Sequence, residues 1–183
     1  MVNPSLRTRI EHVDTDATGI VHFSRYTSLM ETAGTEYLEE HGAGLTAFTA
    51  TGIDVVLTDL RVRYLASAVH RDRIVGEARV AQAGAARLRL AVTLSREEPG
   101  GARTPLVSGE LTFGAVDPAT RHPVPLPPPI RAILKGLHAD AQLHAAPGTG
   151  AHGATAGHLR DQPPGARTAP EAVHRPGPRP RTG

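Results

Sequence analysis

The first hydrophobic pattern in the chain is helical. From Phe23 onward, apolar side chains fall at positions 26, 29, 30, 33 and 37, which is the spacing of one helical face. This spacing predicts a helix from about Ser24 to His41, with Ser24 as its N-cap and Gly42 as the glycine that follows its end. Gly34 lies in the middle of this helix, and a glycine there indicates close packing against another backbone.

After the helix the hydrophobic period changes to two. Apolar and polar residues alternate over 56–64, 88–94 and 107–115, and more weakly over 73–81. Gly84 and the run Pro99-Gly100-Gly101 supply turns between these segments. A short mixed strand, 6–13, precedes the helix, and a proline cluster at 123–129 ends the last strand, with a closing helical turn expected at 130–137. The order predicts an α+β fold in which a five-stranded antiparallel sheet wraps around one long central helix.

Composition changes after residue 137. All six phenylalanine and tyrosine residues lie before residue 114, whereas 138–183 is dominated by Ala, Gly, Pro, His and Arg. Such a segment buries too little apolar surface to offset its ordering entropy, so we expect a folded domain at 1–137 and a disordered tail at 138–183. The tail carries five arginines against three acidic residues, while the domain carries 15 basic and 15 acidic residues. The domain therefore has no basic face that would indicate a nucleic-acid partner.

Several classes of protein are excluded by what the sequence lacks. Without cysteine there is neither a disulfide framework nor a thiolate zinc site. No stretch approaches the roughly 18 apolar residues of a membrane span, and the N-terminal segment has no apolar core of the signal-peptide kind. We therefore expect a cytoplasmic protein with no membrane partner.

One dense polar cluster, the segment 14–19 (DTDATG), stands between the first strand and the helix. A calcium loop of the EF-hand type would need a glutamate at its twelfth position, and Arg25 occupies that position, which excludes it. His12, Asp14 and His70 imitate a two-histidine, one-carboxylate iron site. The predicted helix fills the interval in which such enzymes build a barrel, and this argues against an iron site.

The same cluster fits the D-x-D-x-T motif of haloacid-dehalogenase-like phosphatases at Asp14, Asp16 and Thr18. That family has a buried parallel strand before the first aspartate, and a lysine and an acidic pair after it. Here the preceding residues are half polar, and the single lysine, Lys135, has no acidic pair after it. A Ser-His-Asp triad is disfavoured as well, because no G-x-S-x-G motif occurs.

The cluster continues as Asp-Thr-Asp-Ala-Thr-Gly-Ile-Val, then two residues, then Ser-Arg-Tyr in the helix. This run resembles the hotdog-fold thioesterases of the 4-hydroxybenzoyl-CoA thioesterase type, whose signature is D-x-D-x-x-G-(I/V)-V-(Y/F)-x-x-x-Y. The matching residues are Asp14, Asp16, Gly19, Ile20, Val21 and Tyr26. The resemblance continues through a strand ending YL-x-x-A and through Arg71-Asp72, where the family tends to have Gly-Asp. It covers about residues 5–135 and implies the hotdog fold.

The resemblance implies hydrolysis of an acyl thioester, either an acyl-CoA or an acyl carrier protein, without metal or organic cofactor. In this resemblance, Asp16 matches the catalytic aspartate of the family. Phe23 matches the position whose backbone N–H polarises the thioester carbonyl. A helix N-terminus suits this task, because its free N–H groups and partial positive charge stabilise a developing oxyanion. Asp16 would act as nucleophile or general base, and a turn cap is the alternative role. Asp14 is expected to cap the turn. Substrate contacts are expected from Gly19, His22, Tyr26, Glu31 and Tyr64.

Two departures from the family pattern leave a second function open. His22 stands where Tyr or Phe is usual, and the helix has Glu31-Thr32-Ala33-Gly34 where E-x-A-R is frequent. A non-hydrolytic acyl-binding or accessory protein is the alternative. The run 21–26 is also similar to hotdog thioesterases that release polyketide chains, whereas the D-x4-H spacing of hotdog dehydratases is absent at Asp16. Family active sites lie at subunit interfaces, so we expect a homodimer or homotetramer.

Overall fold

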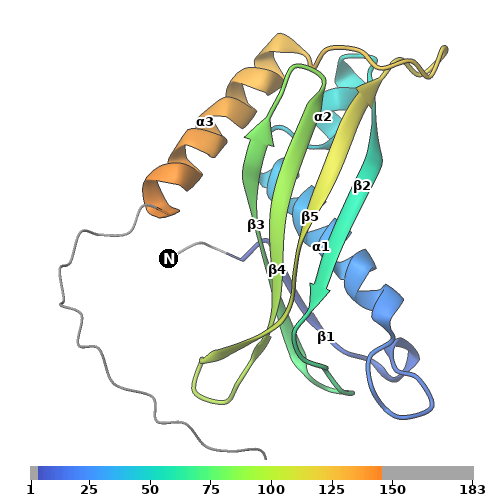
Figure 1. Cartoon of the computed structure of the whole chain (residues 1–183), viewed down its shortest axis with the longest axis vertical. Coiled ribbons are helices and arrows are strands. Elements are labelled where there is room, and N and C mark those ends of the chain that lie inside the picture. The colour runs from blue at the N-terminus through green and yellow to red at the C-terminus, as the bar shows by residue number, and fades with distance from the viewer. Residues whose placement is uncertain (1–3, 146–183) are drawn as a thin grey trace, which may run out of the picture. The chain divides into compact units, whose positions relative to one another are not determined.

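The computed structural model describes residues 4–145, and Figure 1 labels its elements. They are β1 (Leu6–Arg9), the 3-10 turn η1 (His12–Asp14), α1 (Phe23–Glu40), α2 (Leu45–Ala50), β2 (Asp54–Tyr64), β3 (Arg73–Ala83), β4 (Arg87–Glu97), β5 (Arg103–Val116) and α3 (Pro128–Ala145). No helix within residues 4–145 is long and apolar enough to cross a membrane.

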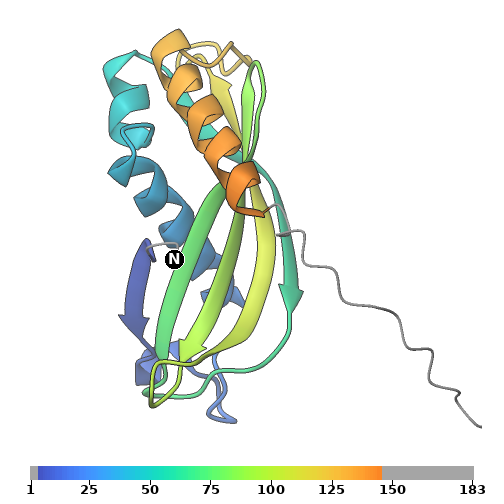
Figure 2. The same cartoon turned by 90° about the vertical axis from the view of Figure 1, so that its left-hand side faces the viewer.

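The five strands form one antiparallel sheet in the order β1-β3-β4-β5-β2. Figure 2 shows the sheet from its side, curved around α1, which lies along one face. The predicted architecture, an antiparallel five-stranded sheet around one long helix, is therefore confirmed. β2 forms one edge of the sheet and pairs only with β5, whereas β1 covers part of β3 at the other edge.

Small residues allow α1 to lie close to the sheet. A Cβ atom added to Gly34 would lie 3.0 Å from Leu111 Cδ1 and 3.1 Å from Leu90 Cδ1. On β3, a Cβ added to Gly76 would lie 2.8 Å from the Cβ of Ala33. Gly34 is therefore closely packed, as predicted, but against the side chains of Leu90 and Leu111 and not against another backbone. The apolar stripe of α1 fills the space between helix and sheet.

Two element boundaries differ from the prediction, and one helix is additional to it. α1 begins at Phe23, so its N-cap is His22, whose Nδ1 accepts a hydrogen bond from the N–H of Ser24. β1 ends at Arg9, because the chain then turns through η1. The short helix α2 was not predicted, since six residues are too few to show a helical period; Phe48 anchors it in the core.

The helix α3 continues past the predicted domain boundary. Residues 138–145, which the composition had assigned to the tail, extend this helix. Three of these eight residues are alanine, the residue that favours helix most strongly. His138 Nδ1 lies 3.2 Å from the carbonyl oxygen of Val80 on β3. Figure 2 shows α3 beside β3, where β1 pairs only with Arg73–Gly76. The remainder of the predicted tail lies outside the described residues.

Candidate active site

The segment between η1 and α1 folds back on itself around Asp16. The N–H of Asp16 donates to the carbonyl of Ile20 at 2.9 Å, and the N–H of Gly19 donates to the carbonyl of Asp16 at 3.0 Å. Gly19 has φ +80°, a conformation that glycine adopts without strain. The N–H of His22 donates to the carbonyl of Asp14, which leads the chain directly into α1.

The two oxygens of the Asp16 carboxylate have different surroundings. Oδ1 accepts hydrogen bonds from the Thr18 N–H at 2.8 Å, the Thr18 hydroxyl at 2.6 Å and the Ile20 N–H at 3.3 Å. Within residues 4–145 no donor contacts Oδ2. The hydrogen bonds from Thr18 are the main cause that lowers the pKa of Asp16 below its ordinary value. The carboxylate is thus ionised at neutral pH, fixed through one oxygen and open at the other.

Asp14, the other aspartate of the motif, holds the turn. Its Oδ2 accepts a hydrogen bond from the N–H of Glu11 at 2.9 Å, and its Oδ1 lies 2.8 Å from Arg25 Nε in an ion pair. Its side chain is only 10% exposed. The expected structural role of Asp14 is confirmed by these contacts, and both of its oxygens are occupied.

The first turn of α1 leaves one backbone donor free. The N–H of Arg25 donates to the carbonyl of His22, and the N–H of Ser24 donates to the imidazole of the same residue. In the described part of the chain, the N–H of Phe23 makes no hydrogen bond. A free N–H at the positive end of an 18-residue helix is suited to bind an anionic oxygen.

Tyr26 and Tyr64 lie beside this helix start. The Tyr26 hydroxyl is buried, which raises its pKa, and it accepts a hydrogen bond from the N–H of Ala68 at 2.7 Å. The Tyr64 hydroxyl donates to the carbonyl of Phe23 at 3.3 Å, and the two tyrosine rings are 5.9 Å apart, edge to face. Both tyrosines and Phe23 line a hollow of about 300 Å³.

The other expected contact residues lie elsewhere in the single chain. His22 lines a separate hollow of about 350 Å³ together with Asp14. Asp16 and Glu31 line neither hollow, and Glu31 is exposed on α1. Gly34 faces the sheet, and the side chains of Leu90 and Leu111 fill the space in front of it.

Sequence reasoning did not assign a role to the segment 65–72, which supports the candidate site from a distant part of the chain. The carbonyl of Ala68 accepts the N–H of Val21 at 3.0 Å, immediately before the helix start. Asp72 holds this segment, because its Oδ2 accepts the N–H of Val69 and lies 3.4 Å from Arg96 Nη1. The signals in the sequence were the matches at YL-x-x-A, which ends at Ala68, and at Arg71-Asp72. Arg71 has φ +75°, a conformation that glycine adopts more easily.

Metal ligands are not grouped in the part of the chain that the structure describes. Among residues 4–145 there is no set of three or more His, Asp or Glu side chains arranged to hold a metal ion. His12 and His70 lie near one another, with ring centroids 5.9 Å apart, but without a third ligand.

Solved structures with this fold include several thioesterases. A 1,4-dihydroxy-2-naphthoyl-CoA thioesterase from Synechocystis is 21% identical with a TM-score of 0.63, over 72% of this chain and 95% of that one. The dynemicin thioesterase is 22% identical with a TM-score of 0.64, over 72% and 94%. A mutant 4-hydroxybenzoyl-CoA thioesterase in complex with 4-hydroxybenzoyl-CoA is 18% identical with a TM-score of 0.63, over 70% and 96%. These similarities establish the hotdog fold.

No curated protein matches the sequence significantly. A family model described as the thioesterase-like superfamily matches residues 10–134, which include the whole motif and the strands β2 to β5 but not β1. The match confirms the thioesterase predicted from the motif at Asp14–Tyr26, and the chain belongs to the thioesterase-like superfamily.

Proposed function

We propose that the protein hydrolyses acyl thioesters of coenzyme A or of an acyl carrier protein, with Asp16 as the catalytic carboxylate. One observation carries this proposal. Three donors hold Oδ1 of Asp16 and leave Oδ2 free, on a turn that leads into a helix whose first N–H, at Phe23, is also free. A fixed carboxylate and an unoccupied donor are the two groups that acyl transfer needs.

The proposed reaction begins with the thioester carbonyl oxygen at the N–H of Phe23. There the N-terminal end of α1 stabilises the negative charge that develops on this oxygen. Oδ2 of Asp16 attacks the carbonyl carbon, or it takes a proton from a water molecule that attacks. The carbon–sulfur bond then breaks and the thiolate leaves, taking up a proton. In the first route, water finally hydrolyses the mixed anhydride formed with Asp16.

The hydrogen bonds from Thr18 favour the nucleophilic route. They lower the pKa of Asp16, so the carboxylate is ionised at neutral pH, as a nucleophile must be. The same shift makes it a weaker base, and general base catalysis is most efficient when the pKa of the base lies near the working pH.

A second copy of the chain would complete the site in this proposal. The outer edge of β2 carries unpaired backbone groups, and Leu57 and Leu60 on this strand are 39% and 36% exposed. Phe23 and Tyr64, beside the free N–H, are also largely exposed. Pairing of two β2 edges into a homodimer would cover these apolar side chains and enclose the hollow between them.

The substrates and ligands of similar structures support the choice of carrier. Two of them act on or bind coenzyme A thioesters of hydroxylated aromatic acids, and the third is a thioesterase with polyene binding. The hollow beside Phe23 has aromatic walls, which are compatible with a flat acyl group. A carrier-bound polyketide chain is the other substrate class in this proposal.

A non-hydrolytic acyl-binding role is the second candidate. It is favoured by one observation, that Asp16 lines neither of the two hollows at the helix start in the single chain. Tight binding of acyl-CoA without release of thiol would support this role.

The test is free-thiol release from aryl-, short-, medium- and long-chain acyl-CoA esters by the wild type and by Asp16→Asn. We expect the substitution to reduce kcat/KM by about 10²–10⁴-fold. Asp117→Asn is the matched control, because Asp117 is another exposed turn aspartate, with its carboxylate bonded to Thr120. Equal activity of wild type and Asp16→Asn would show that the site is wrongly assigned.

A further inference from the structure

His22 joins the turn around Asp16 to the start of α1 through three of its polar groups. Its N–H donates to the carbonyl of Asp14 at 2.9 Å, and its carbonyl accepts the N–H of Arg25 at 2.9 Å. Its ring Nδ1 accepts the N–H of Ser24 at 3.5 Å and lies 2.9 Å from the Ser24 hydroxyl oxygen. The side chain and the backbone of one residue therefore fix how the helix begins.

These bonds decide which backbone donor stays free. The N–H groups in the first turn of a helix have no partner within the helix itself. His22 accepts those of Ser24 and Arg25, while in the described part of the chain the N–H of Phe23 makes no hydrogen bond. The rings of His22 and Phe23 also pack together, with centroids 4.7 Å apart. His22 thus fixes the residue whose N–H meets the thioester in the proposed reaction.

Histidine is an unusual N-cap, because serine, threonine, aspartate and asparagine are preferred there. The Tyr or Phe that is usual at this position has no ring nitrogen, so it could not accept the N–H of Ser24 in this way. Nδ1 of His22 accepts only while it carries no proton, and histidine side chains ordinarily change charge between about pH 5 and 8. His22 is exposed and lines the hollow of about 350 Å³, so protons from solvent reach it.

We propose that neutral His22 is a positioning residue, which caps α1 and holds the N–H of Phe23 toward the thioester, and that protonation of its ring releases this cap. The proposal rests on the thioesterase function proposed above. A protonated Nδ1 can only donate, so it turns to the hydroxyl of Ser24, and the N–H of Ser24 loses its acceptor. A positive charge is also unfavourable at the positive end of a helix.

The charged groups that the structure places around His22 within residues 4–145 are Asp14, Asp16 and Arg25. Asp14 and Arg25 line the same hollow and form an ion pair with each other. Asp16 attracts a protonated imidazole, and this attraction contributes to the lowered pKa of the Asp16 carboxyl. Because Asp16 remains ionised where histidine changes charge, a change of rate in that range reports a histidine and not the catalytic carboxylate.

The first experiment measures kcat and KM of two His22 variants at about pH 8, where a histidine ring is neutral. We expect His22→Ala to lower kcat about tenfold and to leave KM within about twofold, because a bond to the developing oxyanion is made only in the transition state. His22→Asn should restore most of this kcat, since the asparagine oxygen is a strong N-cap for the same N–H.

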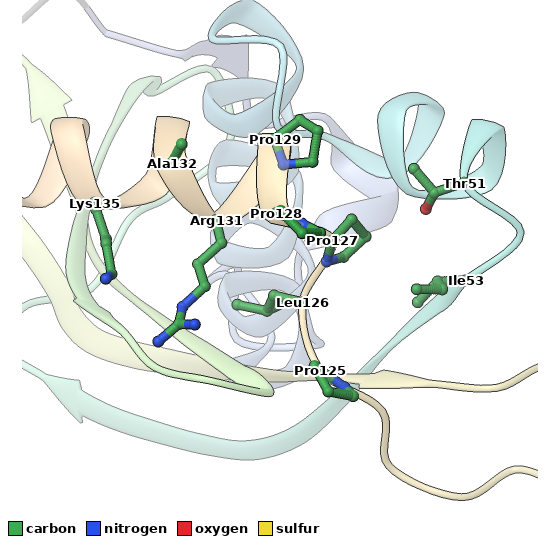
Figure 3. Close-up of a pocket in the computed structure, with 10 residues that line it drawn as sticks. All are labelled: Thr51, Ile53, Pro125, Leu126, Pro127, Pro128, Pro129, Arg131, Ala132 and Lys135. Carbon is green, nitrogen blue, oxygen red and sulfur yellow. The ribbon is translucent and has the colours of Figure 1, made fainter.

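His41→Ala is the matched control. His41 follows the last turn of α1, and its Nδ1 lies 2.7 Å from the carbonyl oxygen of Tyr37. Figure 1 places α2, the next element after His41, at the end of the molecule away from the start of α1. Figure 3 shows the hollow of about 690 Å³ there, whose walls include Thr51 and the prolines of 125–129. At this distance from Asp16, we expect the control to change neither kcat nor its dependence on pH.

The dependence of kcat on pH tests the release of the cap. In the wild type, kcat should fall about tenfold in one step as the pH is lowered from about 8 to about 5, above the range in which Asp16 is protonated and activity is lost completely. His22→Asn should lack this step. The proposal is overturned if the step persists in His22→Asn, if His22→Asn is as slow as His22→Ala, or if the alanine variant changes KM alone.

An NMR titration separates this proposal from the proposed function. If the wild type releases no thiol from any ester, the thioesterase function fails, and the backbone amide signals of Ser24 and Phe23 decide on the cap. Signals that shift together with protonation of the His22 ring would support the proposal. Amide signals that stay unchanged while the ring gains its proton would overturn it.

Discussion

Replacing Gly109 with alanine should force β2 away from β5. In the register of the sheet, Gly109 of β5 lies opposite Val62 of β2. A Cβ atom at this position would overlap the carbonyl oxygen of Arg61 and would lie 2.7 Å from Cε of Met30. The methionine end can rotate, but the oxygen belongs to the β2 backbone, so the strand itself must move.

The cost follows from what that movement breaks. Overpacking in a filled interior costs about 1–3 kcal/mol, and each backbone hydrogen bond lost from the β2–β5 ladder adds about 1 kcal/mol. Two lost bonds give a total of about 3–5 kcal/mol, a large part of the roughly 5–15 kcal/mol that stabilises a domain. For a domain of this size we expect the Tm to fall by about 10–20 °C.

Urea unfolding followed by circular dichroism measures this loss directly. Gly114→Ala is the matched control, since Gly114 also lies on β5 opposite β2 and its added Cβ would meet only the Thr58 methyl group, at 3.3 Å. We expect the control to change the free energy of unfolding by less than about 1 kcal/mol. A Gly109→Ala protein as stable as the control would refute the close approach of β2 to β5.

Three further predictions concern the candidate site and the chain around it. Thr18→Val removes the hydroxyl that contributes most to the low pKa of Asp16, so the acid limb of the kcat/KM pH profile should move to higher pH. Thr18→Ser keeps the hydroxyl and should not move this limb, and an unmoved limb in Thr18→Val would contradict the contact. Arg71→Gly should raise the free energy of unfolding by up to about 1 kcal/mol, because Arg71 has φ +75°, and a lower urea midpoint would contradict this. Truncation after Ala145 should leave the Tm and kcat/KM unchanged, and a large fall in Tm would show that later residues stabilise the domain.

The elements with a long, regular pattern were predictable from sequence. The apolar stripe of α1 and the alternation in β4 and β5 indicate directly which face is buried. Side chains return to the same face about every 3.6 residues in a helix and every second residue in a strand, so the period of the apolar residues identifies the element. Gly34 was informative for a similar reason: its cost within a helix is offset only where close packing needs a missing side chain. Local pattern therefore gave the layers of the fold correctly.

Short and proline-flanked elements were harder. α2 has six residues, and only the buried Phe48 marks it as part of the core. α3 starts within a proline cluster, which interrupts most helices but fits a first turn, where the missing N–H is not needed. Its continuation through residues 138–145 has no apolar stripe that would separate it from the composition of the tail.

The same difference between local and distant contacts applies to the candidate site. The turn around Asp16 is local, so a motif of a few residues specifies it, whereas its support from Ala68 and Asp72 depends on how distant segments meet. The exposed side chains around the helix start follow the same rule. Leu57 and Leu60 on β2 read as part of an ordinary strand in the sequence, and only the strand order shows that β2 forms an edge of the sheet with unpaired backbone groups. A motif can therefore locate the carboxylate, but what covers it depends on contacts that no local pattern encodes.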